Sequence, residues 1–312
     1  CEALWNVDFD SALHIGELAL AKSKEIDYEE GYVFALGDIA GTYFKKGNYA
    51  QSLNYYNQSL IYFEKNNRAD KQAIIYSNIG NVYFTIGNSE LALENYLKTM
   101  TIYEELNDTA GIAQSYNNIA FLYKSRDQFE EALKYYDKAL ELARIIDDKL
   151  SMSYILNNVG ILYSNIGDKG KALETYLESL SIKEGIQDGP MSKVISLNNI
   201  GLIYLNFKDY QLAEQYFIEA YNIASKHNNP YYNASIGLNL SELKKEENLL
   251  AESFNYLISS YKFALEAKTR PLIIEACERL SVYYEKEENW KLSNKYLNEL
   301  ILHNDTLRSE ED

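Results

Sequence analysis

Asparagine returns along this chain at a nearly constant spacing, in a register that begins with an aspartate and ends with an arginine. The positions are Asp38, Asn78, Asn118, Asn158, Asn199, Asn239 and Arg279. Asparagine is a mediocre residue for a helix interior, so helix propensity does not explain this register. A side-chain amide carries N–H donors and a carbonyl acceptor, which match the C=O and N–H of a peptide bond. The register predicts either contacts to the backbone of an extended peptide, or hydrogen bonds and solvation within the protein.

Other residues that carry chemistry do not gather in the sequence. The histidines His14, His227 and His303 are far apart, and there is no Cys-x-x-Cys pair and no glycine-rich phosphate loop. Cys277 falls on an apolar helical face and is predicted to be a buried thiol. We therefore expect no catalytic residues, no metal site and no cofactor, and we predict that this segment is not an enzyme.

The asparagines belong to a longer internal repeat. A tyrosine follows most of them by five positions, at steps of 40, 40, 40, 41 and 80, and these are Tyr43, Tyr83, Tyr123, Tyr163, Tyr204 and Tyr284. Within each half of a repeat, apolar residues fall three or four apart, which is the period of one helical face. Each repeat of about 40 residues is therefore predicted to form two antiparallel helices.

Small residues mark the turns and the helix crossings of these repeats. The turns contain Gly47-Asn48, Gly87-Asn88 and Gly167-Asp168. The glycine is predicted to end the first helix in the left-handed conformation, and the Asn or Asp to cap the second. A second set, in the middle of the first helices, predicts close helix approach and comprises Gly80, Ala120, Gly160 and Gly201.

The pattern L-G-x-x-Y, then G-[DN]-Y, then A-x-x-x-[YF], resembles the tetratricopeptide repeat family over nearly the whole chain. The usual unit has 34 residues. Units of 40 are similar to those of Pins/LGN adaptors, of Rap- and PlcR-type peptide receptors and of some bacterial sensor proteins. The resemblance implies an all-α, right-handed superhelical solenoid of about seven hairpins with a partial N-terminal repeat.

We expect one domain over residues 1–312, because no linker or change of composition interrupts the repeats. The expected units are 1–27 (a partial cap), 28–68, 69–108, 109–148, 149–188, 189–229, 230–270 (degenerate) and 271–312 (the C-terminal cap). In the degenerate unit Lys244 replaces the tyrosine, so its first helix is expected to pack less well.

First helices line the concave groove of tetratricopeptide arrays, so the resemblance implies that the asparagine register faces a ligand. Its neighbours Asn117, Asn157 and Asn198 are further candidates. Apolar candidates either form pockets for ligand side chains or pack against the next first helix, and they are Phe34, Ile74, Tyr154, Ile195, Phe44, Phe84 and Leu205. Phe121 and Ile161 replace Asn81 in later repeats. A clamp for a ligand carboxylate is less favoured, because Lys45, Lys124 and Arg279 are scattered.

The net charge of −16 argues against binding of nucleic acid or of an anionic membrane surface. Nor is there an apolar run long enough to insert into a membrane. A recognition segment of a larger bacterial signal-transduction or transcription-regulating protein fits best, with an extended peptide in the groove. The alternative is a free-standing adaptor or scaffold. Cys1 is either a lipoprotein cysteine exposed by signal-peptide cleavage or the boundary of a segment, so the compartment stays open, with the cytoplasm slightly favoured.

Overall fold

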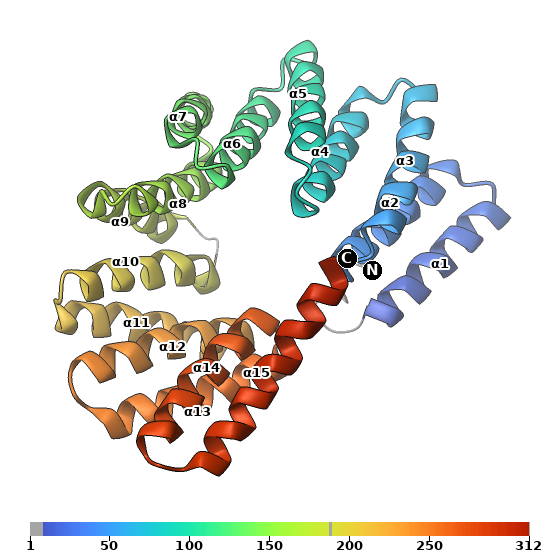
Figure 1. Cartoon of the computed structure of the whole chain (residues 1–312). Helices are drawn as coiled ribbons and strands as arrows, with labels where there is room; N and C mark the ends of the chain where they lie inside the picture. The colour runs from blue at the N-terminus through green and yellow to red at the C-terminus, as the bar shows by residue number, and fades with distance from the viewer. Residues whose placement is uncertain (1–8, 187–188, 312) are drawn as a thin grey trace. The chain divides into compact units, whose positions relative to one another are not determined.

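The computed structural model describes residues 9–186 and 189–311, with side chains described as far as residue 303. Over these residues the chain is all-α, as predicted (Figure 1). The first helices of the hairpins are α2 (Glu29–Lys45), α4 (Ala69–Thr85), α6 (Thr109–Ser125), α8 (Lys149–Asn165), α10 (Val194–Asn206), α12 (Pro230–Glu246) and α14 (Arg270–Lys286). The second helices are α1 (Phe9–Glu25), α3 (Tyr49–Lys65), α5 (Ser89–Glu105), α7 (Phe129–Ile145), α9 (Lys169–Gly185), α11 (Tyr210–Lys226), α13 (Leu250–Glu266) and α15 (Trp290–Glu311), and a short 3₁₀ helix, η2 (Pro190–Lys193), precedes α10.

Most helices are followed by a turn of three residues whose middle residue has a positive φ. After α2 this residue is Gly47, with φ of +82°. The Gly47 N–H donates to the carbonyl of Phe44 and the Asn48 N–H to that of Tyr43, which satisfies the last carbonyls of the helix. The Asn48 side chain then accepts from the Gln51 N–H and caps α3. The predicted turn chemistry is confirmed.

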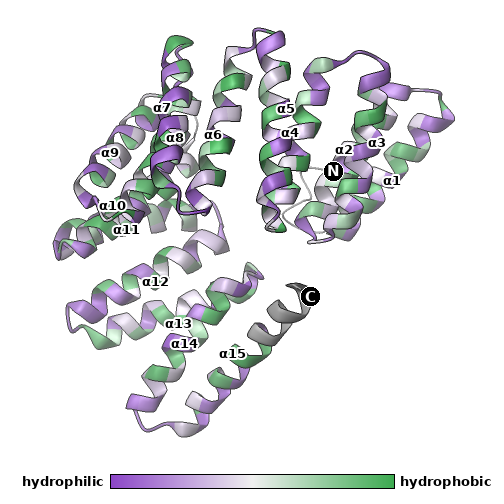
Figure 2. Cartoon of the chain, turned by 45° about the horizontal axis from the view of Figure 1, so that its top comes forward, coloured by the Kyte–Doolittle hydropathy of each residue, from purple (hydrophilic) through white to green (hydrophobic). Residues whose placement is uncertain are grey.

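Contacts between Cα positions group the chain into two compact units, Cys1–Asn158 and Val159–Asp312. In the first unit α2 packs on α3, α4 on α5 and α6 on α7, and α3–α4 and α5–α6 contacts stack the hairpins. In the second unit α10 packs on α11, α12 on α13 and α14 on α15, with α11–α12 and α13–α14 contacts between hairpins. Hydrophobic and hydrophilic residues interleave along these helices (Figure 2), as expected where each helix buries one face. The single domain over 1–312 stays a prediction.

Glycines allow an aromatic ring to approach the first helix closely. A Cβ placed on Gly80 would lie 2.6 Å from the ring of Tyr96, and one on Gly201 would lie 2.6 Å from that of Phe217. Real Cβ atoms do not approach a ring this closely, so these positions admit only glycine unless the ring moves. The close helix approach predicted from the small residues is confirmed.

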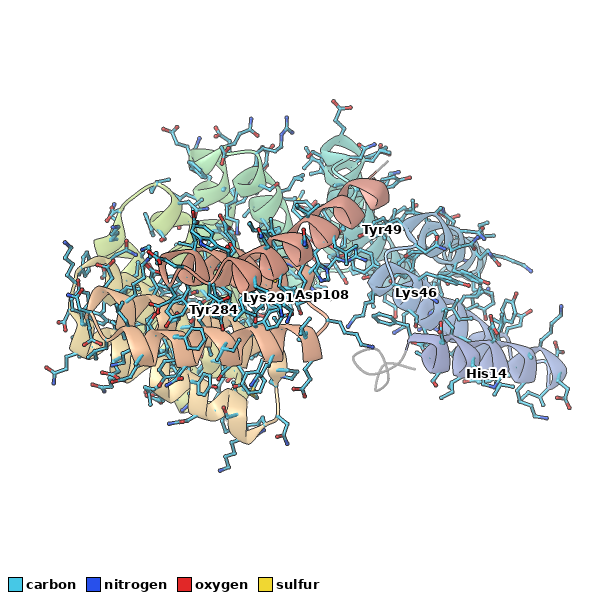
Figure 3. The ribbon with its side chains drawn as sticks, turned by 60° about the horizontal axis from the view of Figure 1, so that its bottom comes forward. His14, Lys46, Tyr49, Asp108, Tyr284 and Lys291 are labelled. Atoms are coloured by element: carbon cyan, nitrogen blue, oxygen red, sulfur yellow. The ribbon has the colours of Figure 1, made fainter. Side chains whose placement is uncertain are left out.

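Four of the recurring tyrosines stack on a second ring twelve positions later, which fixes the two helices of the hairpin against each other, and these are Tyr43, Tyr123, Tyr204 and Tyr284. The two rings are within 10° of parallel, with centroids 5.6 Å apart for Tyr43 and Tyr55 and 5.4 Å apart for Tyr123 and Tyr135. The last hairpin repeats the arrangement with Tyr284, which is labelled in Figure 3. The stacked ring accounts for the tyrosine in these four repeats, whereas Tyr83 and Tyr163 are followed twelve positions later by Asn95 and Thr175.

The first helix of the degenerate unit, α12, is well packed, so the expectation that it packs less well is wrong. Lys244 is only 4% exposed. Its Nζ lies 2.5 Å from Glu214 Oε1 of the preceding hairpin and 3.0 Å from Glu247 Oε2. Burial alone would lower the pKa of Lys244, but the two carboxylates raise it above its usual value. A paired ammonium on a long stem therefore replaces the missing ring.

Residues considered for catalysis stay apart or buried. His14 is exposed on α1 (Figure 3), and His227 is exposed in the turn that follows α11. Cys277 is fully buried, as predicted, and burial with the nearby Glu299 carboxylate raises the pKa of its thiol to about 12. Cys1 lies outside the described residues. Over the part of the chain that the structure describes, no group of three or more His, Cys, Asp or Glu is placed to hold a metal, and no helix is long and apolar enough to cross a membrane.

Candidate functional site

Four hydrogen bonds join successive first helices, and in each the donor lies 41 residues after the acceptor. The donors are side chains of the predicted register, and all four acceptors lie one position before a member of that register in the preceding repeat. We call these bonds the asparagine ladder, and they run from Asn118 Nδ2 to Ser77 Oγ (3.3 Å), Asn158 Nδ2 to Asn117 Oδ1 (3.1 Å), Asn239 Nδ2 to Asn198 Oδ1 (2.8 Å) and Arg279 Nη1 to the Leu238 carbonyl (3.0 Å).

The ladder gives Asn118, Asn158 and Asn239 a role within the protein. Each uses one of its two amide N–H groups toward the preceding first helix. These bonds do not use the second N–H or the carbonyl oxygen of each amide. The internal role predicted for the register is therefore present, while contact with a ligand stays a prediction.

Asn78 differs from the other asparagines of the register. No side-chain hydrogen bond of Asn78 occurs among the described residues, and the residue 41 positions earlier is Gly37, which has no side chain. Asn78 instead lines a small cavity of about 80 Å³. Asn118 also lines this cavity, and its other walls come from α4, α5 and α6 and comprise Ile74, Ser77, Thr99, Tyr103, Gln114 and Ser115. An amide that is free of internal partners thus borders a recess between two first helices.

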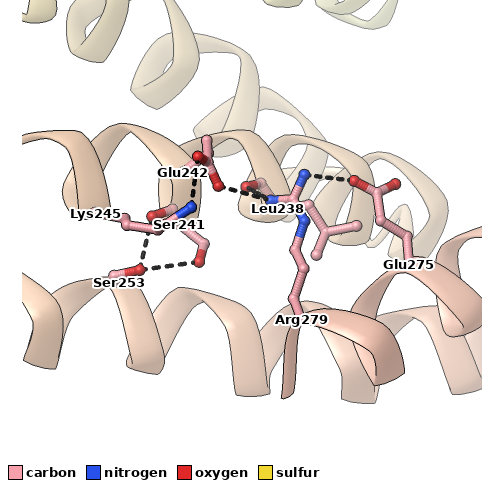
Figure 4. A network of polar contacts seen from close by, with 7 residues as sticks. All are labelled: Leu238, Ser241, Glu242, Lys245, Ser253, Glu275 and Arg279. Atoms are coloured by element: carbon pink, nitrogen blue, oxygen red, sulfur yellow. Dashed lines mark hydrogen bonds and ion pairs between the residues drawn. The ribbon is translucent and has the colours of Figure 1, made fainter. Parts of the chain in front are cut away.

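The remaining members of the register lie on their first helices without gathering at one place. Asp38 on α2 and Asn199 on α10 are half-buried, and Asn157 on α8 is 7% exposed. Arg279 on α14 is committed to internal pairs (Figure 4). Its Nη2 lies 2.6 Å from Glu275 Oε1 and its Nη1 lies 3.7 Å from Glu242 Oε2.

The apolar candidates divide into two groups. Phe34, Ile74, Tyr154 and Ile195 occupy equivalent positions on their helices and are 47%, 44%, 48% and 38% exposed. Phe44, Phe84 and Leu205 are half-buried, and Phe84 packs against the next first helix. The first group therefore presents apolar surface to solvent, whereas packing between helices accounts for part of the second.

The sequence pattern missed a cluster on α4 and α6. The rings of Phe84 and Phe121 lie 5.2 Å apart between centroids, and Lys124 Nζ lies 4.2 Å from the centroid of Phe121. This is the distance of a cation–π contact. The spacing of three between Phe121 and Lys124 on one helix was the signal that would have found it.

Charge is distributed unevenly between first and second helices. The sequences of α4, α6, α8 and α10 contain one carboxylate, Asp70, and three lysines, Lys71, Lys124 and Lys149. The second helices α5, α7, α9 and α11 each carry at least two glutamates. Among these eight helices the excess negative charge therefore lies on the second helices, away from Asn78, Asn118, Asn158 and Asn199.

The match to known repeat families covers most of these helices. The tetratricopeptide repeat family matches residues 32–105, 111–185 and 194–227, which together exceed half of the chain. The chain belongs to the tetratricopeptide repeat family. No curated protein matches this tetratricopeptide repeat chain significantly.

Solved structures share the fold of this tetratricopeptide repeat protein. The apo form of the quorum sensor NprR from B. thuringiensis is 17% identical, with a TM-score of 0.71 over 94% of this chain and 83% of that one. Aspartyl phosphate phosphatase F from Bacillus subtilis is 13% identical, with a TM-score of 0.69 over 91% and 73%. A Rap protein complexed with competence and sporulation factor is 18% identical, with a TM-score of 0.64 over 91% and 79%. Because one of them is named as a phosphatase, the shared fold carries no argument against catalysis.

Proposed function

We propose that this chain is the recognition segment of a larger bacterial signal-transduction or transcription-regulating protein, and that it binds an extended peptide along its first helices. Structural neighbours support the class, since one is a quorum sensor and another is a Rap conjugation regulator in complex with the Phr* peptide. Both are below 25% identity, so the argument for binding depends on the residues of this chain.

The observation that carries the proposal is the Asn78 amide beside its cavity. A polar group that borders a recess and lacks an internal partner gains most from a ligand that supplies one. A peptide backbone offers a donor and an acceptor together, which one asparagine amide matches in a single pair of bonds. The recess of about 80 Å³ is large enough for a small apolar side chain and has the exposed Ile74 in its wall.

The charge distribution supports the same ligand class. Helices α4 and α6, which provide most of the cavity wall, have Asp70 as their one carboxylate. Arg68 pairs with it, with Nε 3.2 Å from Asp70 Oδ1. A strongly cationic ligand finds no opposite charge here, and a polyanion lacks clustered cations. Amide and apolar contacts to a peptide are what these two helices supply.

A binding experiment on Asn78 separates ligand contact from stability. Peptides would be selected from a random display library on the wild-type chain, and their dissociation constants measured for wild type, Asn78→Ala and Asn165→Ala. Asn165 is a matched control, because it is an exposed asparagine at the end of a first helix. We expect Asn78→Ala to weaken binding about three- to tenfold, the value of one hydrogen bond, and Asn165→Ala to leave it unchanged.

Unfolding curves of all three proteins should superimpose, since Asn78 has no ladder bond to lose. Equal affinity of wild type and Asn78→Ala would place the peptide elsewhere on the chain. Failure to select any peptide would refute the proposal. Capture of a folded protein from a lysate by wild type and Asn78→Ala alike would favour the adaptor alternative.

A further inference from the structure

The cluster of Phe84, Phe121 and Lys124 lies on the same strip of α4 and α6 as the cavity. On α6, positions 114, 118, 121 and 124 are three or four apart and share one helical face. Gln114 and Asn118 line the cavity. Lys124 follows Asn118 by six residues, so it lies about 9 Å further along the helix, at about 1.5 Å per residue. A peptide held at Asn78 and Asn118 therefore has this cluster within reach of a neighbouring side chain.

Lys124 differs from most lysines of this chain that lie over aromatic rings. Lys98, Lys171 and Lys295 each lie over a tyrosine ring and also pair with a carboxylate, at 2.7 Å, 3.3 Å and 3.8 Å. Among the described residues Lys124 makes the ring contact without an ion pair. Its helix α6 has no carboxylate in its sequence. The ammonium is thus a charge without an opposite charge, held against an apolar surface.

The environment of Lys124 favours an incoming carboxylate. The side chain is half-buried, and this burial lowers the pKa of its ammonium group. An opposite charge that excludes water at the same place would stabilise the charged form. One ammonium is a compact point charge, which suits one carboxylate and not an extended polyanion.

We propose that Lys124, held over Phe121 beside Phe84, binds a single acidic side chain of the peptide. The methylene groups of an aspartate or glutamate would pack on the two rings while its carboxylate meets the ammonium. This inference rests on the proposed function, because it assigns the specificity of the same binding strip. It predicts that this chain selects peptides with one Asp or Glu next to a segment that is otherwise neutral.

The test uses a random peptide library with acetylated N-termini and amidated C-termini, so that every carboxylate belongs to a side chain. Selections would be run on wild type, Lys124→Met and Lys138→Met. Lys138 is a matched control, because its Nζ lies 5.3 Å from the ring centroids of Tyr116 and Tyr135 and it is on the second helix α7. A selected acidic peptide and its Asp→Asn or Glu→Gln form would then be compared by dissociation constant.

We expect wild type and Lys138→Met to bind the acidic peptide about tenfold more tightly than its amide form, and Lys124→Met to bind the two equally. Circular dichroism and unfolding curves identify any variant that fails to fold, and Lys124→Gln then provides a second substitution. An acidic preference that survives in Lys124→Met would overturn the inference. So would peptides that bind through Asn78 with no acidic preference, which would leave the proposed function standing.

A parallel library with free C-termini identifies the source of the carboxylate. If dependence on Lys124 appears only there, the site takes a terminal carboxylate and the assignment to a side chain is wrong. If neither library yields a peptide for the wild-type chain, the proposed function fails and this inference fails with it.

Discussion

Tyr96 and Tyr136 occupy equivalent positions on α5 and α7 but have hydroxyl groups in opposite situations. The Tyr96 hydroxyl donates to Asn81 Oδ1 at 2.8 Å. Tyr136 is fully buried, and its hydroxyl has no hydrogen-bond partner among the described residues. The cause is a substitution in the facing helix, since Phe121 stands where Asn81 stands one repeat earlier. Removal of the two hydroxyls should therefore change the free energy of unfolding in opposite directions.

The magnitudes follow from the two environments. Tyr96→Phe loses one neutral hydrogen bond and leaves an exposed Asn81 to bond to water, which costs about 1 kcal/mol. Tyr136→Phe removes a buried hydroxyl whose desolvation is uncompensated, which should stabilise the protein by about 1 to 3 kcal/mol. The two variants should therefore differ by about 2 kcal/mol or more, although each loses one oxygen atom.

The assay is urea unfolding followed by far-ultraviolet circular dichroism, with the midpoints of wild type and both variants compared. Phe121→Asn provides the control, because its side chain would supply a hydrogen-bond partner for the Tyr136 hydroxyl. In a chain that carries Phe121→Asn, Tyr136→Phe should therefore become destabilising. Equal destabilisation by Tyr96→Phe and Tyr136→Phe in the parent chain would refute the reasoning, since it would mean that the Tyr136 hydroxyl is satisfied.

Further predictions concern glycine, pH and thiol reactivity. Gly37→Ala should stabilise the chain by about 1 kcal/mol, because no atom lies within 4 Å of the added Cβ. Gly80→Ala should destabilise the chain, because the added Cβ would meet the Tyr96 ring. Urea unfolding measures both effects. Burial raises the pKa of Tyr56 to about 12. The unfolded chain therefore loses this proton first, so stability should fall as the pH rises from about 10 toward 12, in step with a tyrosinate absorbance titration compared with circular dichroism. Cys277, whose thiol pKa is raised to about 12, should react with a thiol reagent near neutral pH only as fast as the chain opens, and denaturant should accelerate the reaction.

The helices and turns were predictable because their causes are local. Gly47 and Asn48 act through backbone groups within five residues, so their sequence alone indicates a helix end and a cap. Gly80 recurs in register with the ring that it admits, which made the close approach visible as a pattern. Repetition strengthened each of these local signals.

The partners of the asparagine register were not predictable in the same way. The bond from Asn158 to Asn117 depends on the offset between neighbouring hairpins, which is a property of stacking and not of any one repeat. Lys244 was misjudged for a related reason, since its carboxylate partner Glu214 belongs to the preceding hairpin. The sequence indicated which residues were unusual, and the packing between hairpins decided what they contact.

The constant offset of the asparagine ladder bears on how such a chain can grow or shrink. Every bond of the ladder joins equivalent points of adjacent hairpins, 41 positions apart. Deletion of residues 118–157 would bring Asn158 to the position of Asn118, opposite Ser77, with donor and acceptor matched as before. Duplication of the same stretch would add one more bond of the same kind. Gain or loss of this one hairpin therefore leaves Asn158 with a hydrogen-bond partner, so the ladder does not oppose a change in the number of repeats at this place.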